Sequence, residues 1–351
     1  MVFKGNTDTN PNADPIHSLY LLTVTKEYRS SLVTYYVFRC YCCRLLICLF
    51  HCSNMPTVYS MPHLFHICSD KIRLMKFLCD SNLINRRRRC LHRNCRRYMC
   101  LIRDRSSADH FRFRCPKCKS LQSVRKGSFF EQTRLTIPQA LYITCCWACK
   151  VPVKSASFMS NVCDRSVSLW YAFLREKCSE SLMTTPNYSF GGPGVVVQID
   201  ESLVAKRKYN VGHLVQPQWV FGLYDTSTKL GHIQLVDDRS AGTLIPIIQR
   251  CVRPGTTIFS DQWSAYRGLQ SLGYVHHTVN HSQNFIDPNT GTCTNAIEAY
   301  WSRVKRNIKL HWLSRRDQLP LRIDEFLWRD RLPTRKYCEA FNEMLRLMAH
   351  H

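Results

Sequence analysis

Acidic residues are scarce in this sequence, and the resulting charge suggests what the chain binds. The 351 residues include 25 aspartates and glutamates against 49 lysines and arginines, which gives a net charge of +24. Such an excess of positive charge points to a polyanionic partner, most commonly nucleic acid. The charge is concentrated, because residues 71–130 contain 18 basic and 3 acidic residues. A chain of this length can bury a sizeable core and is expected to form two or three domains.

The sequence also lacks an apolar run long enough to cross a membrane. Its most apolar stretch, from Val33 to Cys52, is interrupted by Arg39 and Arg44, whereas a spanning helix needs about 20 predominantly apolar residues. We therefore expect no membrane partner. The stretch stays open between an extension without fixed structure, a buried helix and a membrane-associated segment, and residues 1–62 receive no functional assignment.

A secretory signal is also missing, since the polar start MVFKGNTDTNPNADP contains no apolar core. The 20 cysteines cluster irregularly instead of being spaced through a small loop-rich domain. This pattern predicts an intracellular, reducing compartment, in which some cysteines bind metal and the others pack in cores. For a eukaryotic source, we expect the nucleus.

Four cysteines in the basic segment have the spacing of a structural zinc site. Cys115 and Cys118 are separated by two residues, and Cys90 and Cys95 by four. The sequence between the two pairs alternates and turns like a β-hairpin. Two cysteine pairs at the ends of a hairpin place four thiolates where a tetrahedral Zn²⁺ requires them.

The first cysteine pair leaves alternatives open. The true pair could be Cys95 with Cys100, or it could include His92. All of these residues could also be ordinary buried cysteines and a loop histidine. Residues 63–130 are accordingly expected to form a helix followed by a zinc ribbon.

Two candidate DNA-binding features follow the second cysteine pair. Arg125 and Lys126 precede Gly127, and this combination suits close contact with a phosphate. Residues 131–180 then show two helical patterns around a short break, with Thr136 as the expected cap of the first helix. Two helices of this kind after a basic ribbon predict a helix-turn-helix that contacts duplex DNA, and a plain helical connector is the alternative.

Three carboxylates mark the part of the chain that follows a linker at residues 181–194. Within residues 195–330, Asp200 closes the run VVVQID, Asp261 follows TTIFS, and Glu298 lies in a helical pattern. Two acids at strand ends and one on a helix could hold a pair of divalent cations, Mg²⁺ or Mn²⁺, for phosphoryl chemistry. Taken singly, the three could instead be a turn carboxylate, a helix cap and a solvated helix residue.

The pattern of elements in this segment predicts a ribonuclease-H-like fold. Three strands in a meander are followed by a helix, a strand, a helix, a strand and a long helix, with Asp200 ending the first strand and Asp261 the fourth. Residues 331–351 follow as a helical tail. The expected fold class is therefore α/β, with a ribonuclease-H-like catalytic core preceded by a zinc ribbon and a small helical region.

Six runs in this segment match motifs of a known family: GGPGVVVQIDESLVAKRKYNVGH, QWVFGLYD, DDRSAGTLIPII, PGTTIFSDQWSAY, VNHSQNF and TGTCTNAIEAYWSRVK. Together they resemble the Merlin-type, ISXO-two-like family of DDE transposases. The upstream cysteines resemble that family's zinc ribbon, and FLWR at Phe326–Arg329 resembles its C-terminal tail. The resemblance implies a metal-dependent cut-and-paste DNA transposase that acts, as a homo-oligomer, on terminal inverted repeats and target DNA.

The resemblance places the family's catalytic trio on Asp200, Asp261 and Glu298, with 36 residues between the last two. Its following basic position falls on Lys305. Glu201 is expected to point to the opposite face of its strand. Further candidates for contact with DNA near the site are Lys206, Arg207, Lys208 and His281.

The sequence departs from the family at Cys293, where the family usually has histidine. The first cysteine pair is also longer than usual. These departures leave the trio intact, but they favour an alternative function, namely a catalytically silent or domesticated DNA-binding protein.

Overall fold

The computed structural model divides the chain into two units, residues 1–56 and residues 57–351. The residues that it describes are 21–28, 31–38, 47–48, 56–92, 95–184, 189–203, 218–279, 293–309, 318–334 and 336–349. The first unit contains three antiparallel strands, β1 (Leu21–Tyr28), β2 (Ser31–Phe38) and β3 (Ile47–Cys48). Part of the apolar stretch therefore forms strands and not the helix considered above. Across the described residues, no helix has both the length and the apolar character needed to cross a membrane.

The second unit begins with two helices where the periodicity suggests one, α1 (Met61–Ser69) and α2 (Lys71–Asp80). The break falls at Asp70, whose side chain accepts a hydrogen bond from the backbone N–H of Arg73 and thereby caps α2. Leu64, Ile67 and Leu78 are buried between the helices and their neighbours.

The cysteine-rich segment forms a four-stranded antiparallel sheet with its strands in chain order. The strands are β4 (Arg88–Arg89), β5 (Tyr98–Arg103), β6 (Phe111–Arg114) and β7 (Leu121–Ser123). The hairpin expected between the cysteine pairs is the pairing of β5 with β6, in which Cys100 lies opposite Arg114.

Three helices follow the ribbon, α3 (Ile137–Ala148), α4 (Val153–Ser160) and α5 (Asp164–Thr184). Thr136 caps α3 as expected, and the side chain of Gln139 completes a capping box. Helix α4 occupies the segment that sequence patterns treat as a break, because packing compensates for its weak helical propensity. It ends at Asn161, whose φ of 51° is left-handed.

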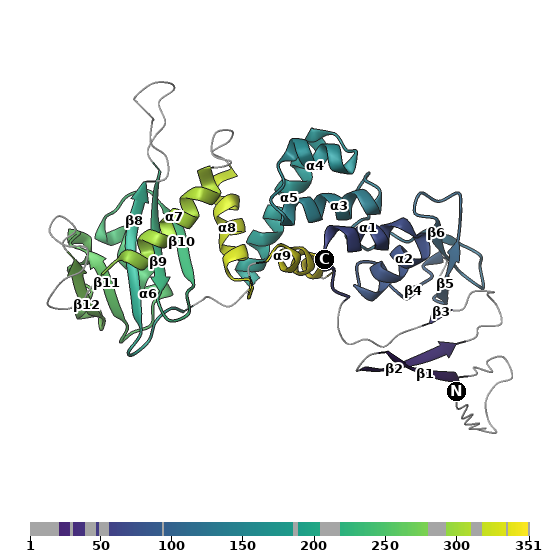
Figure 1. Ribbon diagram of the computed structural model, residues 1–351, viewed down its shortest axis with the longest axis horizontal. Helices are drawn as coiled ribbons and strands as arrows, with labels where there is room; N and C mark the ends of the chain where they lie inside the picture. Colours follow the sequence, from purple (N-terminus) through teal and green to yellow (C-terminus); the bar gives the residue numbers. More distant parts are fainter. Residues whose placement is uncertain are drawn as a thin grey trace. The chain divides into compact units, whose positions relative to one another are not determined.

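The C-terminal half is built on a five-stranded sheet with the order β10-β9-β8-β11-β12 (Figure 1). The strands are β8 (Val196–Leu203), β9 (Trp219–Asp225), β10 (Gly231–Val236), β11 (Thr257–Asp261) and β12 (Val275–Val279). Strands β8, β9 and β10 pair antiparallel, whereas β11 is parallel to both β8 and β12. Three antiparallel strands followed by two parallel ones give the predicted ribonuclease-H-like sheet.

Helices cover both faces of this sheet (Figure 1). On one face, α6 (Ala241–Cys251) packs Leu244 and Ile247 against Val197 and Ile199 of β8. On the other, α7 (Asn295–Lys309) packs with α8 (Leu319–Asp330) in a core shared with β9 and β10. Along β8, Val197 and Ile199 belong to the core on the α6 face, whereas Gln198 and Asp200 contact α7 on the opposite face, as the pleat of a strand requires.

The connection between β11 and β12 differs from the expected helix. It contains two 3₁₀ turns, Ser264–Tyr266 and Gln270–Leu272. Glycine is costly inside a helix, and this short connection has Gly268 between the turns and Gly273, with a φ of 84°, after the second. Tyr266 between the strands is fully buried, in line with a packing role.

Helix α8 joins the sheet to the helical region through Phe326–Arg329. Phe326 and Leu327 belong to the core of the sheet, and Trp328 packs against Trp147 of α3. The guanidinium of Arg329 donates to the carbonyls of Trp147 (2.9 Å) and Ala148 (3.0 Å) at the end of α3. The C-terminal helix α9 (Tyr337–Ala349) is linked to the start of the unit by hydrogen bonds between Asn342 and Val58.

His232 on β10 makes the stability of this domain sensitive to acid. Burial, followed by the positive charges of Arg331 and Arg250, lowers the pKa of His232 to about 4. The unfolded chain, with an ordinary histidine pKa, binds more protons between pH 4 and 6.5, so stability is lost as the pH falls through this range. We expect His232→Gln to remove up to about 3 kcal/mol of that loss.

Denaturant unfolding at a series of pH values measures this effect. The matched control is His66→Gln, because His66 is exposed on α1, and it should keep the wild-type slope. Equal slopes for His232→Gln and wild type would show that His232 does not contribute.

Candidate active site and metal centre

The first two carboxylates lie on neighbouring parallel strands. The register pairs Thr257 with Val196 and Phe259 with Gln198. Continued by two residues, it places Asp261 beside Asp200. Asp261 ends β11 as expected, and its Oδ1 accepts a hydrogen bond from the backbone of the following turn.

Asp200 does not end its strand, in contrast to the expectation from sequence. β8 continues to Leu203, and Asp200 pairs with Gly222 on β9. The extension escapes sequence analysis because Glu201 and Ser202 are polar, yet both pair with apolar residues of β9. Asp200 therefore lies within the sheet, on the face that α7 covers.

Two hydrogen bonds fix α7 on this face. The side-chain Oε1 of Gln198 accepts from the backbone N–H of Ile297 (2.9 Å), and the indole Nε1 of Trp301 donates to Oδ2 of Asp200 (2.9 Å). Glu298 lies between these two anchor points on the first turn of α7 and is exposed. The strand that carries Asp200 thus also positions the helix that carries Glu298.

The Trp301 contact requires glycine at position 222. A Cβ atom at Gly222 would lie 2.6 Å from Cζ2 of Trp301, closer than Cβ contacts in proteins. The missing side chain makes room for the indole that orients Asp200. Sequence analysis missed Gln198, Gly222 and Trp301, and the only available signal for Trp301 was its position three residues after Glu298.

We expect Gly222→Ala to displace Trp301 and to destabilise the domain by about 1–3 kcal/mol, the usual cost of overpacking a core. Thermal unfolding measures this loss. The matched control is Gly242→Ala in α6, where a Cβ atom would meet nothing closer than 3.8 Å, and where alanine favours the helix. If both variants melt at the wild-type temperature, Trp301 does not need the space at Gly222.

Glu201 points away from the trio face, as expected, but it remains electrostatically coupled to the two aspartates. Burial first, and then the negative charges of Asp200 and Asp261, raise the pKa of Glu201 to about 8. Its buried Oε1 has no hydrogen-bond partner among the described residues. On the same side, the guanidinium of Arg239 lies over the rings of Trp219 and Trp263, so Trp263 has a packing role.

The three carboxylates are not gathered as tightly as the cysteines. Within the described part of the chain, the four cysteines form the one group of three or more ligands close enough together to hold an ion. The three carboxylates are therefore spaced more widely than the ligands of a single ion. An arrangement in which Asp200 contributes to two ions, and the other two carboxylates to one each, does not require all three to meet at one point.

The four cysteines predicted as zinc ligands do come together. The Sγ atoms of Cys90, Cys95, Cys115 and Cys118 all lie within 4.8 Å of one another. The distances between Cys90 and Cys118 (3.4 Å) and between Cys95 and Cys115 (3.7 Å) are close to the ~3.8 Å separation of thiolates around a tetrahedral Zn²⁺. The donor set therefore fits such an ion.

The geometry also decides between the alternatives for the first pair, since Cys100 and His92 are not in the group. Hydrogen bonds from Ser120 lower the pKa of Cys118 to about 6. They therefore favour the thiolate, which is the form of cysteine that binds metal.

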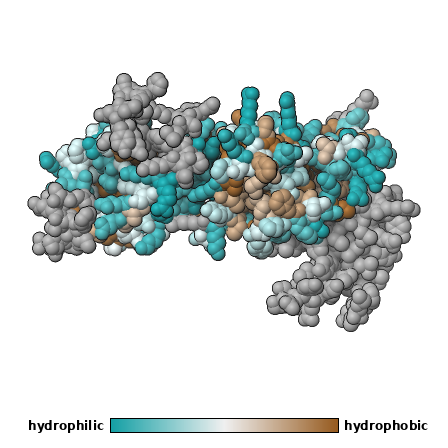
Figure 2. All heavy atoms as spheres, turned by 45° about the horizontal axis from the view of Figure 1, so that its top comes forward, coloured by the Kyte–Doolittle hydropathy of each residue, from teal (hydrophilic) through white to brown (hydrophobic). Residues whose placement is uncertain are grey.

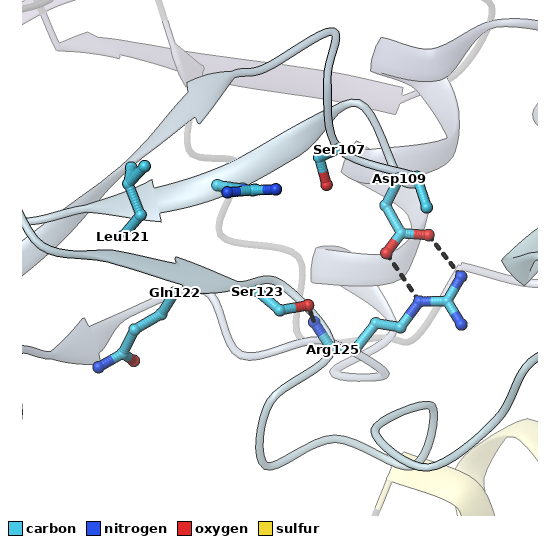
Figure 3. A pocket seen from close by; sticks show the side chains of 8 residues that line it. Ser107, Asp109, Leu121, Gln122, Ser123 and Arg125 are labelled. Carbon is cyan, nitrogen blue, oxygen red and sulfur yellow. Dashed lines mark hydrogen bonds and ion pairs between the residues drawn. The ribbon is translucent and has the colours of Figure 1, made fainter.

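Arg125, a predicted phosphate ligand, is already occupied. Its guanidinium forms a bidentate pair with Asp109 at 2.7 Å (Figure 3) and also donates to the carbonyls of Thr133 and Leu135. The pair lines a cavity of 440 Å³ in the ribbon. Arg125 therefore stabilises the ribbon, whereas the neighbouring Lys126 is exposed.

The other DNA-binding candidates are only partly visible. Lys305 lies on α7, two turns after Glu298, and is half-buried. Lys206, Arg207, Lys208 and His281 lie outside the described residues.

Strand order and strand direction define the C-terminal half as an α/β domain of the ribonuclease-H-like class. Residues 192–330 match the family described as the ISXO2-like transposase domain. A transposase-like protein of Haemophilus influenzae, itself uncharacterised, is 26% identical over 95 residues, which are 27% of this chain and 76% of that protein.

The solved structures to which the chain is similar have lower sequence identity. The HTLV-2 integrase catalytic core in complex with magnesium is 15% identical, with a TM-score of 0.26, over 41% of this chain and 84% of that one. The Mos1 transposase in a pre-cleavage transpososome is 10% identical, with a TM-score of 0.20, over 55% of this chain and 73% of that one. The fold assignment rests on the strand order and not on these scores.

Proposed function

We propose that the chain is a DNA transposase that cleaves and rejoins phosphodiester bonds at the ends of a mobile element. One observation carries the proposal. The register of β8 and β11, continued two residues beyond its last pair, leads to Asp200 and Asp261, and Trp301 connects the helix of Glu298 to that same Asp200. Three carboxylates from two strands and a helix would thus lie on the face of the sheet that α7 covers.

In this proposal Asp200, Asp261 and Glu298 would together hold two divalent cations, Mg²⁺ or Mn²⁺. Bound there, such ions neutralise the attacking and leaving oxygens of an in-line displacement. The protein's own part is to orient the ligands. The indole of Trp301 fixes the direction of the Asp200 carboxylate, and Gln198 fixes the start of α7.

The N-terminal part of the second unit would bring DNA to this site. We propose that the four cysteines bind one Zn²⁺ and that the ribbon presents Lys126 to phosphate. Helices α4 and α5 are joined by three residues and pack on α3, which suits a helix-turn-helix. Figure 2 shows apolar residues at the surface of the face that it draws. Phe158 of α4 is 89% exposed. We propose that the protein acts as a homo-oligomer.

The test is an in vitro transposition assay with the full chain. The donor is DNA bearing the inverted repeats that flank the coding sequence, and the target is a supercoiled plasmid. Addition of Mg²⁺ or Mn²⁺ should produce nicks at the repeat ends and then joined products. If the protein binds the repeats but neither ion supports cleavage, the enzymatic proposal is wrong.

A second candidate function is DNA binding without cleavage. The observation that favours it is the looser grouping of the three carboxylates compared with the cysteines. In the same assay, such a protein would shift the repeat DNA in gels while leaving every phosphodiester bond intact.

A further inference from the structure

A cavity of 790 Å³ lies between the helical region and α8, and its lining does not include Asp200, Asp261 or Glu298. Its charged lining consists of five cationic side chains and one carboxylate. These are Lys150, Arg165, Arg175, Arg322, Arg329 and Glu325. The walls come from the end of α3, from α5, from the end of α7 and from α8, so the cavity exists only because these elements pack together.

Two of the arginines, one buried and one half-buried, each have a buried Nε without a hydrogen-bond partner among the described residues. Arg175 on α5 is only 7% exposed, and its Nε has no hydrogen-bond partner among the described residues. The Nε of Arg322 on α8 is in the same situation. Burial and the positive charge of Arg175 lower the pKa of Arg322. Two cations held together in this way destabilise the fold unless an anion joins them.

The one carboxylate in the wall compensates these charges only in part, because Glu325 raises the pKa of Arg322 less than burial and Arg175 lower it. Glu325 pairs with Arg329 at 2.9 Å, and Arg329 is also bonded to the end of α3. Asp324, the neighbouring acid on α8, accepts a hydrogen bond from Ser179 at 2.6 Å and does not line the cavity.

We propose that Arg175 and Arg322 bind a phosphate group of a nucleic-acid strand in this cavity. Arginine suits this role, because its planar guanidinium can donate two hydrogen bonds to one phosphate. The choice of nucleic acid as the source of the phosphate rests on the proposed function, and the size of the basic surface supports it.

That surface extends well beyond one phosphate. Lys150 donates to Asn307 of α7 at 2.6 Å, and this contact borders a second cavity of 290 Å³ lined by Arg306 and Lys336. Asn307 lies nine residues after Glu298 on α7, or about 13 Å along the helix axis. This distance matches about four base steps of duplex at 3.4 Å each. A strand with one end at the carboxylates can therefore reach the cavity.

The experiment compares full-length wild type with Arg175→Gln, Arg322→Gln and the double variant. The matched control is Arg346→Gln, since Arg346 is an exposed arginine on α9. Binding of inverted-repeat duplex is measured by fluorescence anisotropy at several salt concentrations, without added divalent cation, so that cleavage plays no part. We expect the double variant to bind about tenfold more weakly, and its salt slope to fall by about 0.9, the value for one phosphate contact.

A second measurement separates a binding site from a structural role. Without DNA, Arg175→Gln and Arg322→Gln should melt at or above the wild-type temperature, because each removes one of two positive charges that repel each other. A clear fall in melting temperature with unchanged DNA affinity would overturn the proposal. So would stabilisation of wild type by inorganic phosphate alone if DNA affinity were equal in all variants, since the site would then serve a small anion.

These outcomes are separate from failure of the transposase proposal. If wild type does not bind the repeat duplex at all, the proposed function fails together with this inference. If wild type and the double variant bind the duplex equally, only the phosphate site is wrong.

Discussion

Asp261→Asn and Glu298→Gln will each reduce cleavage of the repeat ends by at least about a thousandfold. The reason is that loss of one ligand weakens or removes an ion that provides several kcal/mol of transition-state stabilisation. The amide substitutions keep the fold. Asparagine at position 261 retains the oxygen that accepts from the backbone of Trp263, and Glu298 is exposed on its helix.

The matched control is Glu176→Gln, because Glu176 is likewise an exposed helical glutamate, on α5. It should cleave at the wild-type rate. DNA affinity, measured in parallel, should be similar for all three variants, so that the loss appears in the rate of the chemical step. Wild-type cleavage by Asp261→Asn would remove the carboxylates from the mechanism.

The strand end at Asp261 could be predicted from the sequence because the local pattern is unambiguous. TTIFS is rich in β-branched and aromatic residues, which favour a strand, and Asp261 is followed by residues that turn. The sequence predicts too early an end for the strand of Asp200, because this strand continues through the polar Glu201 and Ser202, and only their pairing with β9 identifies them as strand. The sequence pattern therefore predicts a strand end correctly only when the change from apolar to polar residues coincides with the end of strand pairing.

Contacts between distant segments were beyond sequence reasoning. Trp301 and Asp200 are 101 residues apart, and their contact depends on a glycine in a third segment. The motif at Phe326–Arg329 could be recognised from the sequence, but its role could not. The structure shows that Arg329 donates hydrogen bonds to the last carbonyls of α3, so the motif joins the ribonuclease-H-like domain to the helical region.

The same limit applies to charge. The net charge of +24 predicted a polyanionic partner, but it did not identify which cations are available. Arg125 is occupied by Asp109, whereas Arg175 is buried without such a partner. Burial and pairing, which arise only in the fold, therefore decide which basic residues can contact DNA.

Cys115→Ser is expected to release the zinc ion and unfold the ribbon. Cys115 is fully buried, and its Sγ lies 3.7 Å from that of Cys95. The ribbon sheet is small, with strands of two to six residues. Structural zinc supplies about 10–16 kcal/mol of apparent folding free energy in small domains, so the ribbon cannot replace it by packing alone.

The metal content should fall from about one zinc per chain, the number that four thiolates bind, to none, as measured by elemental analysis. Limited proteolysis should then cut within residues 88–123, while the ribonuclease-H-like domain stays intact. Cys100→Ser is the matched control, since Cys100 lies in the same ribbon but outside the cysteine group. Zinc loss from Cys100→Ser as well as from Cys115→Ser would favour the alternative first pair, Cys95 with Cys100, and purified wild type without zinc would end the proposal.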